Sequence, residues 1–298
     1  MSSETAFRLT ARVSGMTLTP DPGWPADPPN VYLIQGDDAW AMFDAGWGRG
    51  IDADAIEAWL AGARPRGTPS RLWLSHAHRD HVGGAAWVAR RYGLVPTALE
   101  TERATADRHF PGLAFEPAYA GEAYDLGGAR VTLLGAPGHT AGSLCAFLEA
   151  NEGADILFTG DTVVGRHSSW IGPPDGDLEA YLQTLARLAD PALPYAAARL
   201  APGHGPAGAV TGAVAATLRE RRLARDEDIL RLLPDAPSPR RLVRRLYGEA
   251  RGPILGPGGV AERTVVAHLE RLVRLGRAAV KDEGPDPFLR TYRPTAPE

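Results

Sequence analysis

The chain has 298 residues, of which 44% are hydrophobic and 23% are charged, with a formal net charge of −4 at pH 7. This composition is typical of a globular protein and excludes a largely disordered chain, and the length is sufficient for two domains. The single cysteine, Cys145, excludes an intrachain disulfide, and no stretch has the length and apolarity of a membrane span. We find no signal-peptide pattern and expect a cytoplasmic protein.

The first elements are a proline-rich loop and a hairpin. Five prolines within residues 20–30 disfavour both helix and sheet, and Trp24 in this loop would either close over a substrate or pack on its own loop. Residues 31–34 and 39–43 then form a hairpin around a Gly-Asp-Asp turn, and Asp44 follows its second strand. The spacing of apolar residues next predicts a helix over residues 51–61.

The densest group of potential metal ligands lies between a buried strand ending at Leu74 and a helix predicted over residues 85–92. Its sequence is Ser75-His76-Ala77-His78-Arg79-Asp80-His81. The two histidines at positions 76 and 78, on near-extended backbone, can point the same way and hold one cation. The aspartate and histidine at positions 80 and 81 turn aside and can hold a second. Mixed imidazole and carboxylate ligands favour borderline divalent metals such as zinc.

Three further potential ligands each follow a predicted strand and lie in a glycine-rich turn. They are His139 in Pro-Gly-His-Thr, Asp161 in Thr-Gly-Asp-Thr and His204 in Pro-Gly-His-Gly. Glycine lets the backbone bend sharply after a strand and direct the next side chain. Residues 165–170, including His167, are expected at the mouth of a pocket, either contacting substrate or serving only as a loop. His109, which has no partner motif, is interpreted as a surface residue.

The C-terminal quarter differs from the rest of the chain in charge. Residues 1–218 hold 15 basic and 24 acidic side chains, whereas residues 219–298 hold 17 basic and 12 acidic ones, a net charge of +5. We therefore predict a catalytic domain over residues 1–218 and a separate module over residues 219–298. Helices are predicted around residues 177–188, 207–223, 219–233, 239–247 and 261–275, followed by a hairpin. The last three helices and the hairpin resemble a winged helix, in which His268 is packed.

The last predicted helix carries several basic residues that suggest two roles for the module. These are Arg263, Arg271 and Arg274, with Arg277 just beyond the helix. Basic side chains on one face attract phosphates by charge and by counterion release. Alternatively, the module only packs on the catalytic domain or on a second subunit, because acidic residues interrupt the same face. The sequence leaves both interpretations open.

The order His-x-His-x-Asp-His, followed by His139, Asp161 and His204, resembles the metallo-β-lactamase superfamily of hydrolases over about residues 5–218. The resemblance implies an α/β fold, a four-layer αββα sandwich with a metal site at one edge between the sheets. One metal would be held by His76, His78 and His139 and the other by Asp80, His81 and His204, with Asp161 bridging. Asp80 would also orient the nucleophile, and Asp44 matches an aspartate that supports the metal site.

A metallo-β-lactamase-like domain followed by a winged-helix-like module narrows the resemblance. Together with residues 30–33, 174–178 and 202–206, this layout is similar to the β-lactamase-like protein 2 group, some members of which cut single-stranded RNA. Related enzymes of similar layout hydrolyse acyl thioesters, so the layout leaves the substrate open.

The resemblance implies a metal-dependent hydrolase in which a metal-bridged hydroxide cleaves an ester or thioester-type bond of a small substrate. Two divalent ions are expected, zinc first, although manganese and iron accept the same ligands. The alternatives are a single-stranded RNA endoribonuclease and a non-catalytic nucleic-acid-binding protein. The expected partners are accordingly a small ester or thioester, or RNA, but no membrane, and the oligomeric state is open.

Overall fold

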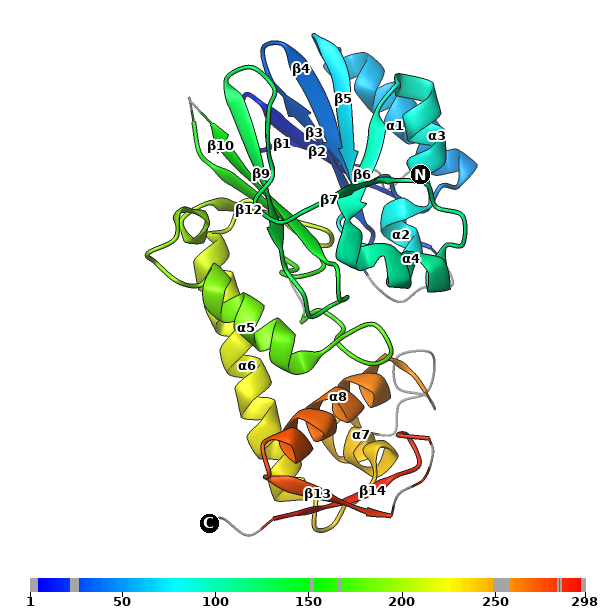
Figure 1. The fold of residues 1–298 in the computed structure, drawn as a ribbon, viewed down its shortest axis with the longest axis vertical. Helices are drawn as coiled ribbons and strands as arrows, with labels where there is room; N and C mark the ends of the chain where they lie inside the picture. Colours follow the sequence, from blue (N-terminus) through cyan, green and yellow to red (C-terminus); the bar gives the residue numbers. More distant parts are fainter. Residues whose placement is uncertain are drawn as a thin grey trace.

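Figure 1 shows the fold of the protein in a computed structural model. The structure describes residues 5–21, 27–150, 153–165, 168–248, 258–282, 284 and 286–295. Trp24 and His167, the two loop residues considered as substrate contacts, lie outside these ranges. Among the helices that are described, none is both long and apolar enough to cross a membrane.

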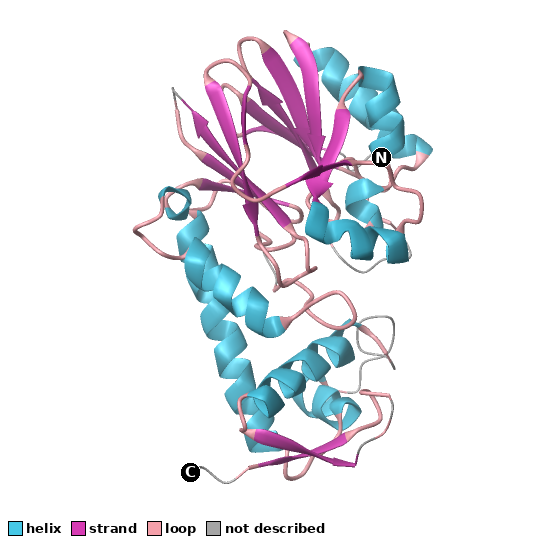
Figure 2. Cartoon of the chain, viewed as in Figure 1, coloured by secondary structure: helices cyan, strands magenta, loops and turns pink. Residues whose placement is uncertain are grey.

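Two β-sheets face each other in the N-terminal three quarters of the chain (Figure 2). The first sheet contains β1 (Thr5–Arg8), β2 (Val13–Thr17), β3 (Asn30–Gln35), β4 (Ala39–Phe43), β5 (Thr68–Trp73), β6 (Val95–Leu99) and β7 (Glu116–Ala118), in that spatial order. The second contains β8 (Ala123–Asp125), β9 (Ala129–Gly135), β10 (Leu144–Ala150), β11 (Ile156–Gly160) and β12 (Arg199–Pro202), in the reverse spatial order, from β12 to β8.

Helices cover the outer face of each sheet. The helices that pack along the first sheet are α1 (Gly50–Ala63), α2 (Arg79–Val82), α3 (Ala85–Tyr92), η1 (Glu100–Glu102) and α4 (Arg103–His109). Those along the second are α5 (Leu178–Leu188), η2 (Pro194–Ala196) and α6 (Thr211–Leu232). The order of layers is therefore helix, sheet, sheet, helix, and the predicted αββα architecture is confirmed.

The core follows from the two-residue period of the strands. In β4 and β5, Phe43 and Trp73 point into the cluster between the two sheets, whereas Met42 and Leu72 point into the cluster beneath α1 and α3. A third buried cluster, which includes Cys145 and Tyr181, joins the second sheet to α5 and α6. Because both faces of β4 are covered, this strand is a continuous run of apolar residues, whereas β5 is apolar only at its end, at Leu72 and Trp73.

The prediction of separate helices over residues 207–223 and 219–233 is wrong. The structure has one continuous helix, α6, which crosses the predicted boundary between residues 218 and 219. Residues 213–232 contain neither proline nor glycine and consist mainly of Ala, Leu, Arg and Glu, which favour helix, so the change of charge along the chain does not interrupt it. The division into two domains stays a prediction.

The C-terminal region consists of the end of α6 with α7 (Pro239–Tyr247), α8 (Val260–Arg274), β13 (Ala278–Asp282) and β14 (Thr291–Pro294). It has its own buried cluster, formed by residues such as Ile229, Leu242 and Leu269. His268 is fully buried and bonds to Asp226 at 2.6 Å, so its prediction as a packed residue is confirmed. The helices and the hairpin are present, and their assignment as a winged helix stays a prediction.

Candidate metal centre

The seven predicted ligands meet at one edge of the two sheets. His76 and His78 follow β5, His139 follows β9, Asp161 follows β11 and His204 follows β12, while Asp80 and His81 lie on α2. In the described part of the chain, four groups of three His and Asp residues have ligand atoms within 4.8 Å of one another, and two of these groups contain only predicted ligands and share no member. These two groups are His76, His78 and His139, and Asp80, His81 and His204.

Three imidazole nitrogens meet in the first group. Nε2 of His76 lies 2.9 Å from Nδ1 of His78, and Nε2 of His139 lies 3.1 and 3.0 Å from these two atoms. Burial, with a further contribution from His78, lowers the pKa of His139 to about 4. Burial and the surrounding histidines also lower the pKa of His76 well below its usual value. These two imidazoles are therefore neutral near pH 7, the form that binds metals.

The outer nitrogens of the ligand histidines are bound to the protein, which fixes where their lone pairs point. Nδ1 of His139 donates to the Trp170 carbonyl at 2.6 Å, and Nδ1 of His204 donates to the Asp27 carbonyl at 2.7 Å. A neutral imidazole that donates from Nδ1 has its lone pair on Nε2. In the first group the lone pair of His139 therefore faces the nitrogens of His76 and His78.

A divalent metal ion fits this arrangement. Nitrogens bound to one zinc ion at about 2.0–2.1 Å lie about 2.9–3.4 Å apart for bond angles between about 90° and 110°. The 2.9–3.1 Å separations in the first group lie within that range. In addition, Oδ1 of Asp161 is buried and has no hydrogen-bond partner in the described part of the chain.

The second group adds carboxylates to imidazoles. Nε2 of His204 lies 3.3 Å from Nε2 of His81 and 3.2 Å from Oδ2 of Asp80. Oδ1 of Asp161 lies 3.4 Å from Nε2 of both His81 and His204, and its Oδ2 lies 3.7 Å from Nε2 of His139. Asp161 thus presents a different oxygen to each group.

The two groups differ in their electrostatics. Burial alone would lower the pKa of His204, but the Asp161 and Asp80 carboxylates outweigh it and raise that pKa to about 9. Burial would raise the pKa of Asp161, but His204 and His81 hold it well below its usual value. The second group therefore combines carboxylates that can balance a cation with a His204 that holds a proton near pH 7, whereas His76 and His139 of the first group are neutral there.

Local backbone conformation separates the ligands of the His76–His81 segment. His78 is extended, with φ −78° and ψ 150°, and α2 begins at the next residue. The sequence predicts a loop up to residue 84, whereas the structure has a short helix, α2, that carries Asp80 and His81. Because successive helical residues project about 100° apart, this helix directs Asp80 and His81 away from the pair at 76 and 78.

Asp44 supports this segment from the end of β4. Its two carboxylate oxygens accept hydrogen bonds from the Ser75 backbone N–H at 2.7 Å and from Nδ1 of His81 at 2.8 Å. The residue has a left-handed backbone with φ 62°, which aspartate tolerates better than most residues. It lies where the resemblance implies a supporting aspartate.

Gly203 allows β11 and β12 to bring their ligands close together. A Cβ atom at this position would lie 2.5 Å from Oδ1 of Asp161 and 2.9 Å from Cε1 of His81. Any larger residue would therefore push the second group apart.

Glu102 is a buried residue of the site that the sequence analysis missed. Its carboxylate, 1% exposed, accepts hydrogen bonds from the Ala77 N–H at 2.8 Å, the Thr140 hydroxyl at 2.8 Å and the Gly142 N–H at 2.9 Å. It thereby joins the loop of His76 and His78 to the loop of His139. No motif marks this residue, because its partners lie 25 to 40 positions away along the chain.

His109 lies at the surface as predicted, with 38% of its side chain exposed, but it has a partner that the sequence does not indicate. Nε2 of His109 bonds to Oδ2 of Asp175 at 2.6 Å, and its ring lies 5.3 Å from the ring of His78. Arg108 bonds to the other oxygen of Asp175 at 2.8 Å. The contact joins residues 66 positions apart, so the spacing in the sequence does not indicate it. On its other side, His78 stacks on Trp170.

The four arginines considered as phosphate contacts bind other parts of the molecule. Arg271 pairs with Glu179 at 2.7 Å and with Asp226, and Arg274 pairs with Asp177 at 3.0 Å. Arg277 pairs with Glu227 at 2.7 Å, and Arg263 donates to the Pro173 carbonyl at 3.1 Å. This finding favours the interpretation in which the C-terminal region packs on the catalytic part.

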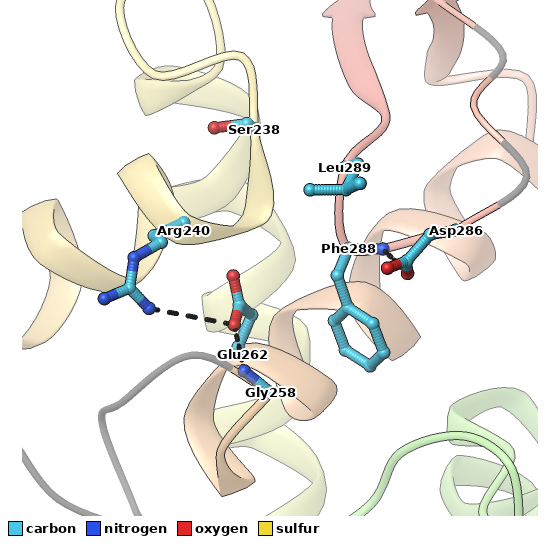
Figure 3. Close-up of a pocket in the computed structure, with 7 residues that line it drawn as sticks. All are labelled: Ser238, Arg240, Gly258, Glu262, Asp286, Phe288 and Leu289. Carbon is cyan, nitrogen blue, oxygen red and sulfur yellow. Dashed lines mark hydrogen bonds and ion pairs between the residues drawn. The ribbon is translucent and has the colours of Figure 1, made fainter.

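A hollow of about 460 Å³ lies in the C-terminal region (Figure 3). It is lined by Ser238, Arg240, Gly258, Glu262, Asp286, Phe288 and Leu289. Glu262 accepts the Gly258 N–H at 2.6 Å and faces Arg240 at 3.9 Å, so the charge of its carboxylate is balanced within the lining. None of the seven candidate metal ligands lines this hollow.

The profile of the Metallo-beta-lactamase superfamily matches residues 24–234, and the chain belongs to this superfamily. An atrochrysone carboxyl ACP thioesterase of Passalora fulva is 29% identical over 162 residues, which are 54% of this chain and 44% of that protein. A hydroxyacylglutathione hydrolase of Pseudomonas putida is 33% identical over 150 residues, 49% of this chain and 53% of that protein. The chain spans about half the length of these curated relatives.

Solved structures share the fold over nearly the whole chain. A metallo-beta-lactamase family protein from Thermus thermophilus has a TM-score of 0.77 and 25% identity, covering 97% of this chain and 100% of that one. A beta-lactamase domain protein from Burkholderia ambifaria has a TM-score of 0.80 and 19% identity, covering 97% and 94%. Because each covers 97% of this chain, the likeness extends into the C-terminal region.

Proposed function

We propose that the protein is a dinuclear metal-dependent hydrolase that cleaves an ester or thioester-type bond of a small acyl substrate. The observation that carries the proposal is the meeting of two groups of nitrogen and oxygen ligand atoms at one edge of the sheets, with Asp161 facing both. His76, His78 and His139 would hold one divalent ion, zinc first, and Asp80, His81 and His204 the other. The mixed nitrogen and oxygen donors suit zinc, and manganese or iron accept them as well.

Such ions, when bound, supply a water of near-neutral pKa and polarise the oxygen that gains charge during hydrolysis. The residues of the chain orient and shield this chemistry. The Asp80 carboxylate, 12% exposed and 3.2 Å from His204, is placed to orient the attacking water and to accept its proton. Trp170 stacks on His78 with its ring centroid at 5.7 Å and supplies an apolar wall beside the first group.

The proposed substrate class is based on the relatives that match the sequence of this chain. The names of the two matched relatives are those of an acyl carrier protein thioesterase and of a hydroxyacylglutathione hydrolase. Cleavage of RNA, as in the β-lactamase-like protein 2 group, would need free cations along a groove. The four arginines that first suggested phosphate binding are engaged in contacts within the molecule, so the acyl substrate is the better-supported proposal.

The test is a substrate panel on zinc-loaded protein that contains acyl thioesters, aryl esters, lactones and single-stranded RNA. We expect turnover of thioesters or esters with little dependence on ionic strength. Cleavage of RNA that weakens steeply with salt would overturn the proposed substrate class. The double variant His76→Ala/His78→Ala should lose all activity, and activity retained at the wild-type level would overturn the metal mechanism. Arg130→Ala, a change of an exposed side chain on β9, serves as the control.

A further inference from the structure

We propose that Asp175 is a positioning residue that holds His78 with the correct nitrogen toward the first metal. The inference rests on the proposed function, since it concerns one of the proposed ligands. Asp175 lies in the loop between Trp170 and α5, and its side chain is 1% exposed. It belongs to neither proposed ligand group, and it lies with His78 and His109 in a third cluster of His and Asp side chains, on the side of His78 that faces away from His76 and His139.

His78 differs from the other ligand histidines in the nitrogen that it presents. His76, His81, His139 and His204 point Nε2 toward the other ligand atoms, whereas His78 points Nδ1. The four residues that present Nε2 each have an oxygen atom beside Nδ1, from Ser75, Asp44, Trp170 and Asp27 respectively. His78 therefore needs an acceptor on the opposite side of its ring, at Nε2.

Asp175 is the acceptor placed at that nitrogen. Its Oδ2 lies 3.6 Å from Nε2 of His78, and this nitrogen is buried without a hydrogen-bond partner in the part of the chain that the structure describes. A proton held on Nε2 by a nearby carboxylate leaves the lone pair on Nδ1, where it faces His76 and His139. A movement of about half an ångström would close the 3.6 Å separation to a hydrogen bond.

The carboxylate of Asp175 is itself anchored. Nε and Nη2 of Arg108 donate to Oδ1 at 3.2 and 2.8 Å, and His109 bonds to Oδ2 at 2.6 Å. These cationic and polar partners balance the charge of a buried carboxylate, which would otherwise be costly. The ring centroids of Trp170 and His109 lie 5.7 and 5.3 Å from that of His78. These two rings restrain the orientation of the His78 ring, in addition to the effect of Asp175 on its tautomer.

The C-terminal region holds the loop that carries Asp175. Arg263 at the start of α8 donates to the Pro173 carbonyl, and a Cβ atom at Gly172 would lie 2.9 Å from the Arg263 backbone. Arg274 near the end of α8 pairs with Asp177 at 3.0 Å. The same helix thus fixes this loop on either side of Asp175, which gives α8 a part in supporting the metal site.

The test compares Asp175→Asn with Asp107→Asn, a change of the same type at an exposed position of α4. Zinc affinity is measured by competition with a chromogenic chelator, and the site is observed by the absorption spectrum of the cobalt-substituted protein. We expect Asp175→Asn to weaken zinc binding about 10- to 100-fold and to shift the cobalt bands, because supporting carboxylates have effects of that size. Asp107→Asn should change neither.

Zinc affinity within about twofold of wild type, together with an unchanged cobalt spectrum, would overturn the role of Asp175, given the effect expected of a supporting carboxylate. If Asp175→Asn does not fold, as judged by circular dichroism, Arg108→Gln replaces it, since the Arg108 side chain is 44% exposed and its loss frees the carboxylate. We expect Arg108→Gln to weaken zinc binding several-fold, and unchanged binding would again overturn the role. His78→Ala separates the two proposals: if it leaves zinc affinity unchanged, the proposed metal site itself fails.

Discussion

The carboxylate of Glu102 accepts a hydrogen bond from the hydroxyl of Thr140 at 2.8 Å and so joins two loops that each carry proposed metal ligands. Its second oxygen accepts the Ala77 N–H, also at 2.8 Å. Burial raises the pKa of Glu102, while these hydrogen bonds act in the opposite direction. The residue therefore has a buried carboxylate that accepts hydrogen bonds from Thr140, Ala77 and Gly142, each of which is a hydrogen-bond donor.

Glu102→Gln should destabilise the protein. The new amide group would face the N–H of either Ala77 or Gly142, and a buried donor without an acceptor costs about 1–3 kcal/mol. We expect a loss of that size in the free energy of unfolding, measured by urea denaturation. Glu100→Gln, on the same turn but 43% exposed, should change it by less than about 0.5 kcal/mol. Equal effects of the two changes would contradict this prediction.

Asp44→Asn should weaken metal binding with little strain in the backbone. Asparagine tolerates the left-handed conformation at φ 62°, but its amide would face a donor, either Nδ1 of His81 or the N–H of Ser75. We expect zinc affinity, measured by chelator competition, to fall about 10- to 100-fold. Asp37→Asn, an exposed aspartate at the turn of the same hairpin, should leave zinc affinity unchanged.

Arg271→Ala should destabilise the protein far more than Arg277→Ala. The Arg271 side chain is 12% exposed and pairs with Asp226, which is 2% exposed. Removing one member of a buried pair leaves an uncompensated charge and costs about 3–5 kcal/mol. Arg277 and Glu227 are exposed, and such pairs contribute less than about 1 kcal/mol. Thermal unfolding of the two variants measures the difference, and similar midpoints would contradict the packing role of α8.

Cys145 should be unreactive in the folded protein. It is fully buried, and burial raises the pKa of its thiol from 9.0 to about 12. Because the thiolate is the reactive form, labelling by a disulfide reagent at about pH 8 should be at least about 100-fold slower than in denaturant. The folded state keeps the proton while the unfolded state releases it above pH 9.0, so this residue lowers stability as the pH rises from 9.0 toward about 12. Rapid labelling of native protein would contradict the buried position.

The resemblance was sufficient to predict the layers, and the sequence was sufficient to predict that the candidate ligands follow strands. Strands such as β6 are recognisable from apolar runs, and ligands such as His139 follow strands in glycine-rich turns. The supporting roles could not be predicted in this way, because the contacts of Glu102 and Asp175 span from 25 positions, for Ala77 and Glu102, to 97 (175 − 78), for His78 and Asp175. The ion pairs of Arg271 could not be predicted either, because its partners, Glu179 and Asp226, lie on α5 and α6.

Helix α6 connects the second sheet to the C-terminal core without a break. With 22 residues it is a rod of about 33 Å. Its first half packs against the second sheet, through residues such as Leu218, and its second half contributes Ile229 to the C-terminal core. A flexible tether would let the end of the chain reorient freely, whereas a continuous helix buried at both ends holds the C-terminal core in a set orientation to the sheet that bears Asp161 and His204.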